Sequence, residues 1–208
     1  MKLSILDIGF GNLSSLKNAF SFLGIENRII NQVSEIENSE SIILPGDGSF
    51  KAIKTVYEKN YFKPLCDHVN KKRPLLGICL GMQFFANLSN EDSTNKGFGW
   101  IPGEVIKFKS SDKLQVPHIG YNSIEHEFNH TILENIKNNS DFYFIHSFFY
   151  LPRSSKHTLA KTEYGQKFSS IIVKDNILGV QFHPEKSQQN GLLFLKNFYT
   201  FSKKTYHD

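Results

Sequence analysis

Strand and helix signals alternate along the first 90 residues, and this alternation restricts the fold more than any other feature of the chain. Short apolar runs bounded by turn residues predict strands at residues 2–8, 27–33, 41–46 and 73–78. Apolar residues at helical spacing predict helices at residues 13–24, 48–60, 62–72 and 80–89. Asn12 suits the N-cap of the first helix and Gly24 suits its C-terminal end. Strands and helices in this order form βαβ units, which predicts a mostly parallel central sheet flanked by helices.

Strand-like segments linked by short polar turns dominate the second half of the chain. They lie at residues 104–108, 122–127, 142–150, 158–164, 169–174 and 177–183. Residues 174–176, Lys-Asp-Asn, suit a hairpin turn, and residues 189–204 predict a closing helix. We therefore expect an α/β fold with an antiparallel β extension in the second half, and one domain over residues 1–208.

Charge and cysteine content narrow the class of protein. The chain has 24 basic and 20 acidic residues, and its charge clusters, such as residues 71–73, are short, which favours a solvated face over a nucleic-acid site. Two cysteines are too few for a disulfide scaffold and suit a reducing cytosol. The N-terminal apolar run is too short for a signal peptide, and Asp7 interrupts it. No segment approaches the roughly 20 apolar residues of a membrane helix. We expect a cytoplasmic protein without membrane or nucleic-acid partners.

Cys79 lies between Gly77 and Gly81, after a predicted strand and before a predicted helix. This is the layout of a nucleophile elbow, in which a sharp turn lifts the nucleophile above the sheet. The N-terminus of the following helix would favour the thiolate and lower the pKa of the thiol. The alternative interpretation is a small buried side chain that only packs, which is also what we expect of Cys66.

A nucleophilic thiol needs a base and a group that orients the base. Pro184 favours an extended backbone at His183, and the i, i+2 spacing then places His183 and Glu185 on one side of the chain. The carboxylate would hold one imidazole nitrogen while the other faces the thiol. Five further histidines have polar neighbours and are expected at the surface: His68, His126, His130, His157 and His207.

Zinc binding is a rival chemistry for Cys79, His183 and Glu185. These residues lack the tightly paired ligand spacings of most zinc motifs, so we predict no metal site. Residues 9–12, Gly-Phe-Gly-Asn, lack the third glycine of a dinucleotide fingerprint, and we predict no cofactor.

Residues 44–50, Leu-Pro-Gly-Asp-Gly-Ser-Phe, follow another predicted strand. Gly46 and Gly48 allow backbone N–H groups to turn toward a ligand. Together with the N–H of Leu80, such groups could form an oxyanion hole for acyl chemistry. The alternative is a plain turn that ends the strand.

Three separated segments resemble one family. Residues 77–83 (Gly-Ile-Cys-Leu-Gly-Met-Gln), 181–187 (Gln-Phe-His-Pro-Glu-Lys-Ser) and 44–50 together are similar to the triad, or class I, glutamine amidotransferases. Residues 7–20, 97–105, 117–122 and 142–148 extend the resemblance toward the glutaminase subunits of imidazole glycerol phosphate synthases, in the same order along the chain. The resemblance covers essentially the whole chain and implies a flavodoxin-like sheet.

The resemblance implies a reaction and roles for particular residues. Cys79 would attack the side-chain amide carbon of glutamine, His183 would move protons between thiol, ammonia and water, and Glu185 would orient His183. Leu80 and Gly48 would supply oxyanion-hole N–H groups. The substrate pocket would be completed by Gly46, Gln83 and the backbone around His146 and Ser147.

A chain that only released ammonia would waste glutamine, so a separate subunit should receive the ammonia. The resemblance implies a (β/α)8-barrel cyclase that makes imidazole glycerol phosphate and an aminoimidazole carboxamide ribotide in histidine biosynthesis. Its docking face would include Asn12, the loop 117–122 with Tyr121, and Lys186. The alternatives are a paralogue that supplies ammonia for another acceptor, such as a surface sugar, and a non-catalytic amidotransferase-like module.

Two positions depart from the family pattern. Asp47 stands where an apolar residue is more common, and a carboxylate beside a developing oxyanion would oppose it. We therefore expect Asp47 to point away from the thiol. Tyr121 stands where tryptophan is usual, which changes the size of an aromatic side chain on the expected docking face.

Overall fold

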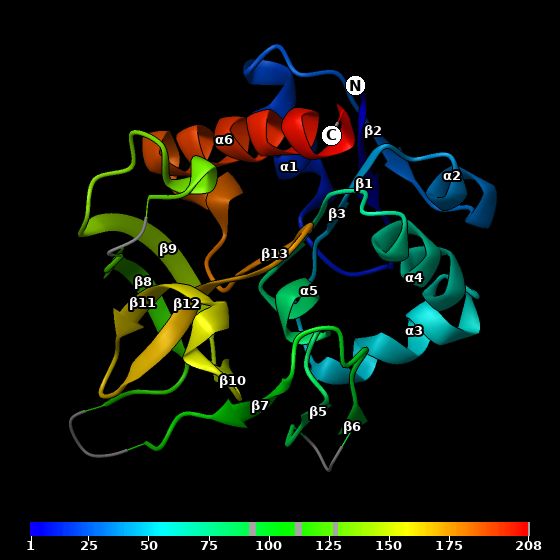
Figure 1. The fold of residues 1–208 in the computed structure, drawn as a ribbon. Coiled ribbons are helices and arrows are strands. Elements are labelled where there is room, and N and C mark those ends of the chain that lie inside the picture. Colours follow the sequence, from blue (N-terminus) through cyan, green and yellow to red (C-terminus); the bar gives the residue numbers. More distant parts are fainter. Residues whose placement is uncertain (92–94, 111–113, 127–128, 208) are drawn as a thin grey trace.

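The computed structural model describes residues 1–91, 95–110, 114–126 and 129–207. Its centre is a seven-stranded sheet with the strand order β11-β12-β13-β4-β3-β1-β2 (Figure 1). Five neighbouring strands are parallel: β2 (Asn27–Ile30), β1 (Leu3–Leu6), β3 (Ser41–Leu44), β4 (Leu75–Ile78) and β13 (Ile177–Val180). Two antiparallel strands extend the sheet beyond β13, namely β12 (Lys167–Lys174) and β11 (Thr158–Glu163). The predicted parallel sheet with an antiparallel extension is confirmed.

Helices cover both faces of the parallel strands. Every residue of β1, β3, β4 and β13 is buried, as a sheet with two covered faces requires. Leu3 and Ile5 pack in a cluster with Phe20 of α1 (Leu13–Phe22) and Phe198 of α6 (Gln188–His207), whereas Leu6 belongs to a second cluster. Helices on that second side are α2 (Val33–Glu37), α3 (Ile53–Glu58) and α4 (Phe62–Asn70). No helix in the described ranges is long and apolar enough to cross a membrane.

The ends of α1 match their predicted signals. Oδ1 of Asn12 accepts a hydrogen bond from the N–H of Ser15 at 3.2 Å, which satisfies a donor that the first helical turn leaves free. Leu23 caps the C-terminus, and Gly24 follows with φ +69°, a conformation that glycine adopts without steric cost. Asn12 therefore fixes where the chain enters the helix.

Two smaller sheets lie beside the central sheet, one at the bottom and one at the left of Figure 1. One has the order β10-β7-β5-β6 and is built from β10 (Phe148–Pro152), β7 (Gly103–Lys107), β5 (Leu88–Ser89) and β6 (Asn95–Lys96). The other pairs β8 (His118–Ile124) with β9 (Ser140–His146) in antiparallel register. Short 3-10 helices complete the described elements: η1 (Phe50–Ala52), η2 (Thr131–Leu133), η3 (Ser155–His157) and η4 (Pro184–Lys186).

Two element predictions are wrong, and the segment 117–122, expected as a docking loop, is strand β8 from His118 onward. The helix predicted over residues 80–89 stops after one turn as α5 (Leu80–Gln83), because the carbonyls of Phe84 and Ala86 accept hydrogen bonds from the backbone of residues 98 and 99. The single strand predicted over residues 142–150 is divided at Ser147, because β9 pairs with β8 while β10 pairs with β7.

The surface prediction for the histidines is also wrong at two positions. His68 and His157 are buried, with 2% and 9% of their surfaces exposed. Each imidazole lies within hydrogen-bond distance of a backbone carbonyl, Pro74 for His68 at 3.0 Å and Val173 for His157 at 3.2 Å, which compensates for lost water. His126 and His130 are half-buried, and the side chain of His207 lies outside the described part of the chain.

Candidate active site

The backbone turns sharply at Cys79, between β4 and α5. Cys79 has φ +52° and ψ −106°, a strained conformation for a residue with a side chain. A Cβ at Gly81 would lie 1.9 Å from the carbonyl oxygen of Leu44, and a Cβ at Gly77 would lie 2.5 Å from the Phe85 ring. Both glycines are therefore required by close contacts, as the elbow interpretation expects.

Parallel pairing brings distant parts of the sequence to this turn. β4 and β13 are neighbours with Ile78 opposite Val180, so their carboxyl ends meet at one edge of the sheet. Cys79 follows the first strand, and Gln181 and His183 follow the second. Residues at the carboxyl ends of adjacent parallel strands form ligand sites in many α/β proteins. The sheet thus places the thiol and the imidazole together.

His183 and Glu185 form a buried pair. Nδ1 of His183 lies 2.9 Å from Oε1 of Glu185, and only 5% and 2% of the two side chains are exposed. The N–H of His183 donates to the carbonyl of Tyr143, and the Ser187 hydroxyl donates to the carbonyl of His183, which fixes the backbone of this turn. The i, i+2 spacing therefore produces the contact expected from the sequence.

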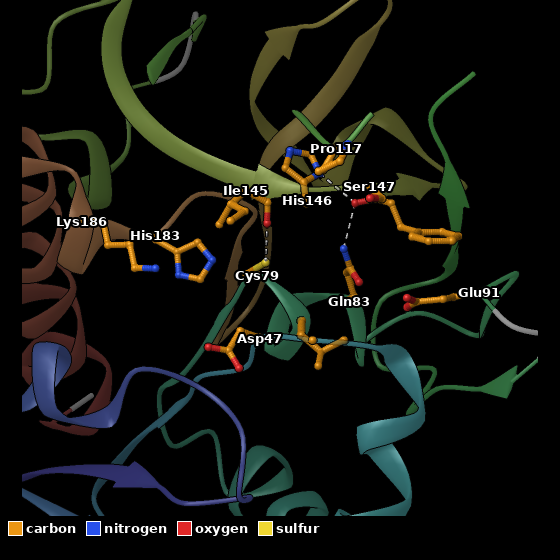
Figure 2. Close-up of a pocket in the computed structure, with 13 residues that line it drawn as sticks. Asp47, Cys79, Gln83, Glu91, Pro117, Ile145, His146, Ser147, His183 and Lys186 are labelled. Atoms are coloured by element: carbon orange, nitrogen blue, oxygen red, sulfur yellow. Dashed lines mark hydrogen bonds between the residues drawn. The ribbon is translucent and has the colours of Figure 1, made fainter. Parts of the chain in front are cut away.

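The second nitrogen of His183 is the one available to the thiol. Nε2 makes no hydrogen bond to another described residue, and Figure 2 shows the imidazole beside Cys79. Burial alone lowers the pKa of His183, but the Cys79 thiolate and the Glu185 carboxylate outweigh burial and raise this pKa to about 10. The environment therefore favours the charged form of the His183 imidazole.

The thiol itself is largely buried and has a hydrogen-bond donor close to it. Sγ of Cys79 lies 3.5 Å from Nε2 of Gln181 and 4.0 Å from the carbonyl oxygen of Ile145. Sequence reasoning missed Gln181, although the alternation of an extended chain places it on the same side as His183, two residues later. The helix after the thiol is only four residues long, so its dipole is much weaker than that of the predicted helix over residues 80–89.

A pocket of about 340 Å³ opens over the thiol (Figure 2). The predicted site residues that line it are Gly48, Cys79, Leu80, Gln83, His146, Ser147, His183 and Lys186. Gly46 does not line the pocket but lies against Leu80, where an added Cβ would be 2.9 Å from Leu80 Cβ. Five further lining residues were not predicted as pocket residues: Asp47, Glu91, Pro117, Ile145 and Phe148.

Asp47 sits at the rim of this pocket, but its carboxylate is engaged elsewhere. Oδ1 of Asp47 accepts a hydrogen bond of 3.0 Å from the N–H of Gly11. The neighbouring Gly48 has φ +91°, which a residue with a Cβ rarely adopts. The loop that carries Asp47 is thus tied to the loop before α1.

The side chain of His146 is held by contacts at both ring nitrogens. Nδ1 lies 2.8 Å from the carbonyl oxygen of Phe148 and Nε2 lies 3.1 Å from Nδ1 of His118. His118 in turn lies 3.3 Å from Nδ2 of Asn122. Burial lowers the pKa of His146 to about 3 and that of His118 to about 4, so both rings are neutral. Both ring nitrogens of His146 are occupied, so neither is free to bind a ligand.

The predicted docking residues lie in two places. The hydroxyl of Tyr121 donates to the carbonyl of Lys186 at 2.9 Å, and Nζ of Lys186 lies 5.9 Å from the centre of the Tyr143 ring. Tyr121 is 49% exposed and Ile119 on the same strand is 57% exposed. Asn12 uses its side chain to cap α1. Tyr121 and Lys186 form a surface continuous with the pocket, because Lys186 also lines it.

Metal binding would be a rival use of the same side chains. Among the described residues, no group of three or more His, Cys, Asp and Glu side chains could hold a metal ion. The Glu185 carboxylate is instead committed to Nδ1 of His183.

Comparison with known proteins identifies the class that this fold and site define. The model of the family named glutamine amidotransferase class-I matches residues 4–200. The solved structure of PurLQS from Thermotoga maritima has a TM-score of 0.76 and 15% identity, with 96% of this chain and 98% of that chain covered, and it shares the fold. The chain belongs to the class-I glutamine amidotransferase family.

More similar relatives narrow the class. The chain is 41% identical over 198 residues to imidazole glycerol phosphate synthase subunit HisH 1 of Campylobacter jejuni, covering 94% of this chain and 98% of that one. It is 40% identical over 199 residues to imidazole glycerol phosphate synthase subunit HisH of Chlorobaculum tepidum, covering 95% and 98%. Within the class, it belongs to the HisH family, and the resemblance seen in the motifs is confirmed.

Proposed function

We propose that this chain hydrolyses glutamine to glutamate and ammonia, with Cys79, His183 and Glu185 as its catalytic triad. The observation that carries the proposal is the strained turn that presents Cys79 to a buried imidazole whose other nitrogen is 2.9 Å from Glu185. Similarity over nearly the whole length to proteins named HisH supports the same reaction.

The reaction runs through a thioester. The thiol proton moves to Nε2 of His183, and the sulfur electron pair attacks the amide carbon of glutamine. The resulting oxyanion receives hydrogen bonds from the N–H groups of Leu80 and Gly48. Its collapse breaks the C–N bond, and His183 gives the proton to the departing ammonia. Water then attacks the thioester while His183 takes a proton from it, which releases glutamate and restores Cys79.

The pocket residues have supporting roles in this proposal. Gln83 holds the substrate glutamine, and the backbone around His146 and Ser147 completes the same pocket. Gly46 lets the oxyanion loop lie against Leu80, because the contact leaves no room for a side chain. The reaction requires no metal or cofactor.

Ammonia released here serves a second subunit. The relatives are named as subunits of a synthase, which supports an assembly of at least two chains. We take the partner to be a (β/α)8-barrel cyclase in a heterodimer, with Asn12, Tyr121 and Lys186 on the docking face. In this proposal the chain is one glutaminase domain over residues 1–208 that works in cytoplasmic histidine biosynthesis.

Glutamate release from glutamine, measured with and without the cyclase partner and its ribotide substrate, tests this proposal. We expect release to rise at least tenfold when partner and acceptor are both present. Rescue of a histidine auxotroph by the gene together with its cognate partner gene tests the acceptor. Glutamate release without rescue would assign the chain to another acceptor, such as a sugar, and no release under any condition would favour a non-catalytic module.

A further inference from the structure

The dipole of the short helix α5 is weak, so it gives little stabilisation to a thiolate at Cys79. Attack on glutamine needs a thiolate, and α5 offers only four residues in place of the long helix expected from the sequence. A neutral hydrogen-bond donor next to the sulfur would favour the charged form. The donor in that position is Nε2 of Gln181, 3.5 Å from Sγ and on a side chain with no exposed surface.

The orientation of the Gln181 amide follows from its neighbours. Nε2 of Gln83 lies 3.0 Å from the carbonyl oxygen of Phe148, which can only accept. The group of Gln83 that faces the Phe148 carbonyl is therefore its NH₂ group. The second hydrogen of this NH₂ group is donated to Oε1 of Gln181, with Nε2 and Oε1 3.2 Å apart. With its oxygen used in this way, Gln181 presents its NH₂ group to the sulfur.

The carbonyl that sets this orientation is itself fixed. The neutral imidazole of His146 donates to the same oxygen of Phe148 from Nδ1 at 2.8 Å. Figure 2 shows the two dashed lines from Gln83 and His146 meeting at one oxygen atom. The backbone N–H of Gln181 donates to the carbonyl of Ser170 at 3.0 Å, so the residue is anchored at its main chain as well.

We propose that Gln181 is a further catalytic residue: its amide donates a hydrogen bond to the thiolate of Cys79, and the Gln83–Phe148 contacts hold it in the donating orientation. This rests on the proposed function in taking Cys79 as the nucleophile. The same bond stabilises the thiolate when it leaves the thioester during hydrolysis. Gln181 therefore serves both halves of the reaction.

The pH dependence of Cys79 alkylation by iodoacetamide tests this role without using glutamine. The Cys66→Ala background leaves Cys79 as the one thiol, since the chain has two cysteines. Gln181→Met keeps an unbranched side chain but removes the donor. We expect alkylation at pH 7 to slow about tenfold while the limiting rate at high pH stays close to the parent's, because a charge-assisted hydrogen bond is lost.

Ser170→Ala is the matched control, since its hydroxyl is buried in the adjacent strand and has no hydrogen-bond partner among the described residues. It should leave the alkylation profile unchanged. If Gln181→Met does not fold, Gln181→Asn shortens the side chain by one methylene and should shift the profile in the same direction. An unshifted profile in a folded Gln181 variant would overturn the proposal.

Glutaminase kinetics separate this inference from the proposed function. We expect Gln181→Met to lower kcat/KM for glutamine about tenfold at pH 7, with a smaller loss at higher pH where the thiolate forms unaided. A shifted alkylation profile in a chain that releases no glutamate would support the role of Gln181 while contradicting the reaction. An unshifted alkylation profile in a variant of an enzyme that does release glutamate would contradict the role of Gln181 while supporting the reaction.

Discussion

The surroundings of Cys79 are set by the glycines on either side of it, by the His183–Glu185 pair and by Gln181. The glycines around Cys79 and the spacing of His183 and Glu185 carry local constraints that are visible in the sequence. Gln181 belongs to the same motif, yet its role depends on Gln83, 98 residues away in the chain. A contact of that kind is set by strand pairing, which a sequence motif does not specify.

The carboxylate of Asp47 should have little effect on the oxyanion. Its carboxylate is bound to the N–H of Gly11, so we expect Asp47→Val to change glutaminase turnover without the partner by less than about threefold. Asp47→Asn, which keeps an oxygen for Gly11, is the matched control. A tenfold or larger rise in partner-free turnover for both variants would mean that the charge acts on the oxyanion, whereas a rise for the valine variant alone would trace to the lost contact with Gly11.

At the scale of elements, the parallel strands were predictable and the irregular ones were not. Continuous apolar runs mark β1, β3, β4 and β13, because both faces of each strand are buried. The early end of α5 depends on carbonyls that bond to residues 98 and 99, and the break at Ser147 depends on a change of sheet. Neither cause is local, so neither leaves a periodic signal.

The hydrogen bond between the buried rings of His118 on β8 and His146 on β9 should contribute to the stability of the fold. His118→Phe keeps the aromatic stack with Tyr164, whose ring centre lies 3.9 Å away, but leaves Nε2 of His146 without a donor. An unsatisfied buried acceptor costs about 1–3 kcal/mol, which urea unfolding would measure. Ile119→Ala, at the exposed neighbouring position, should change stability far less. Equal stabilities for His118→Phe and the parent would contradict the hydrogen bond.

At the scale of the whole molecule, buried histidines should make stability depend on pH. Burial lowers the pKa of His68 and His118 to about 4 and that of His146 to about 3, against an ordinary value of 6.5. Below pH 6.5 the unfolded chain therefore binds protons that the folded chain does not. The free energy of unfolding should fall toward pH 4, by up to about 1.4 kcal/mol per pH unit for each such histidine.

His183 acts in the opposite direction. Its pKa is raised to about 10, so its contribution to the free energy of unfolding is complete below pH 6.5 and is lost as the pH rises toward 10.

Urea unfolding of the parent and of His68→Gln at pH 7 and pH 5 isolates the part of the acid destabilisation that comes from His68. The variant should lose less stability between these values, and an equal loss would contradict a neutral His68.

The sheet explains why the proposed nucleophile and the proposed base, which are far apart in sequence, form one site. β4 and β13 end side by side, and the residues after them carry the thiol and the imidazole. Glutamate release by single-cysteine variants shows whether Cys79 is the nucleophile of a glutaminase. Cys79→Ala should lower release more than about a thousandfold while Cys66→Ala retains it. Release by folded Cys79→Ala at the parent rate would contradict the account.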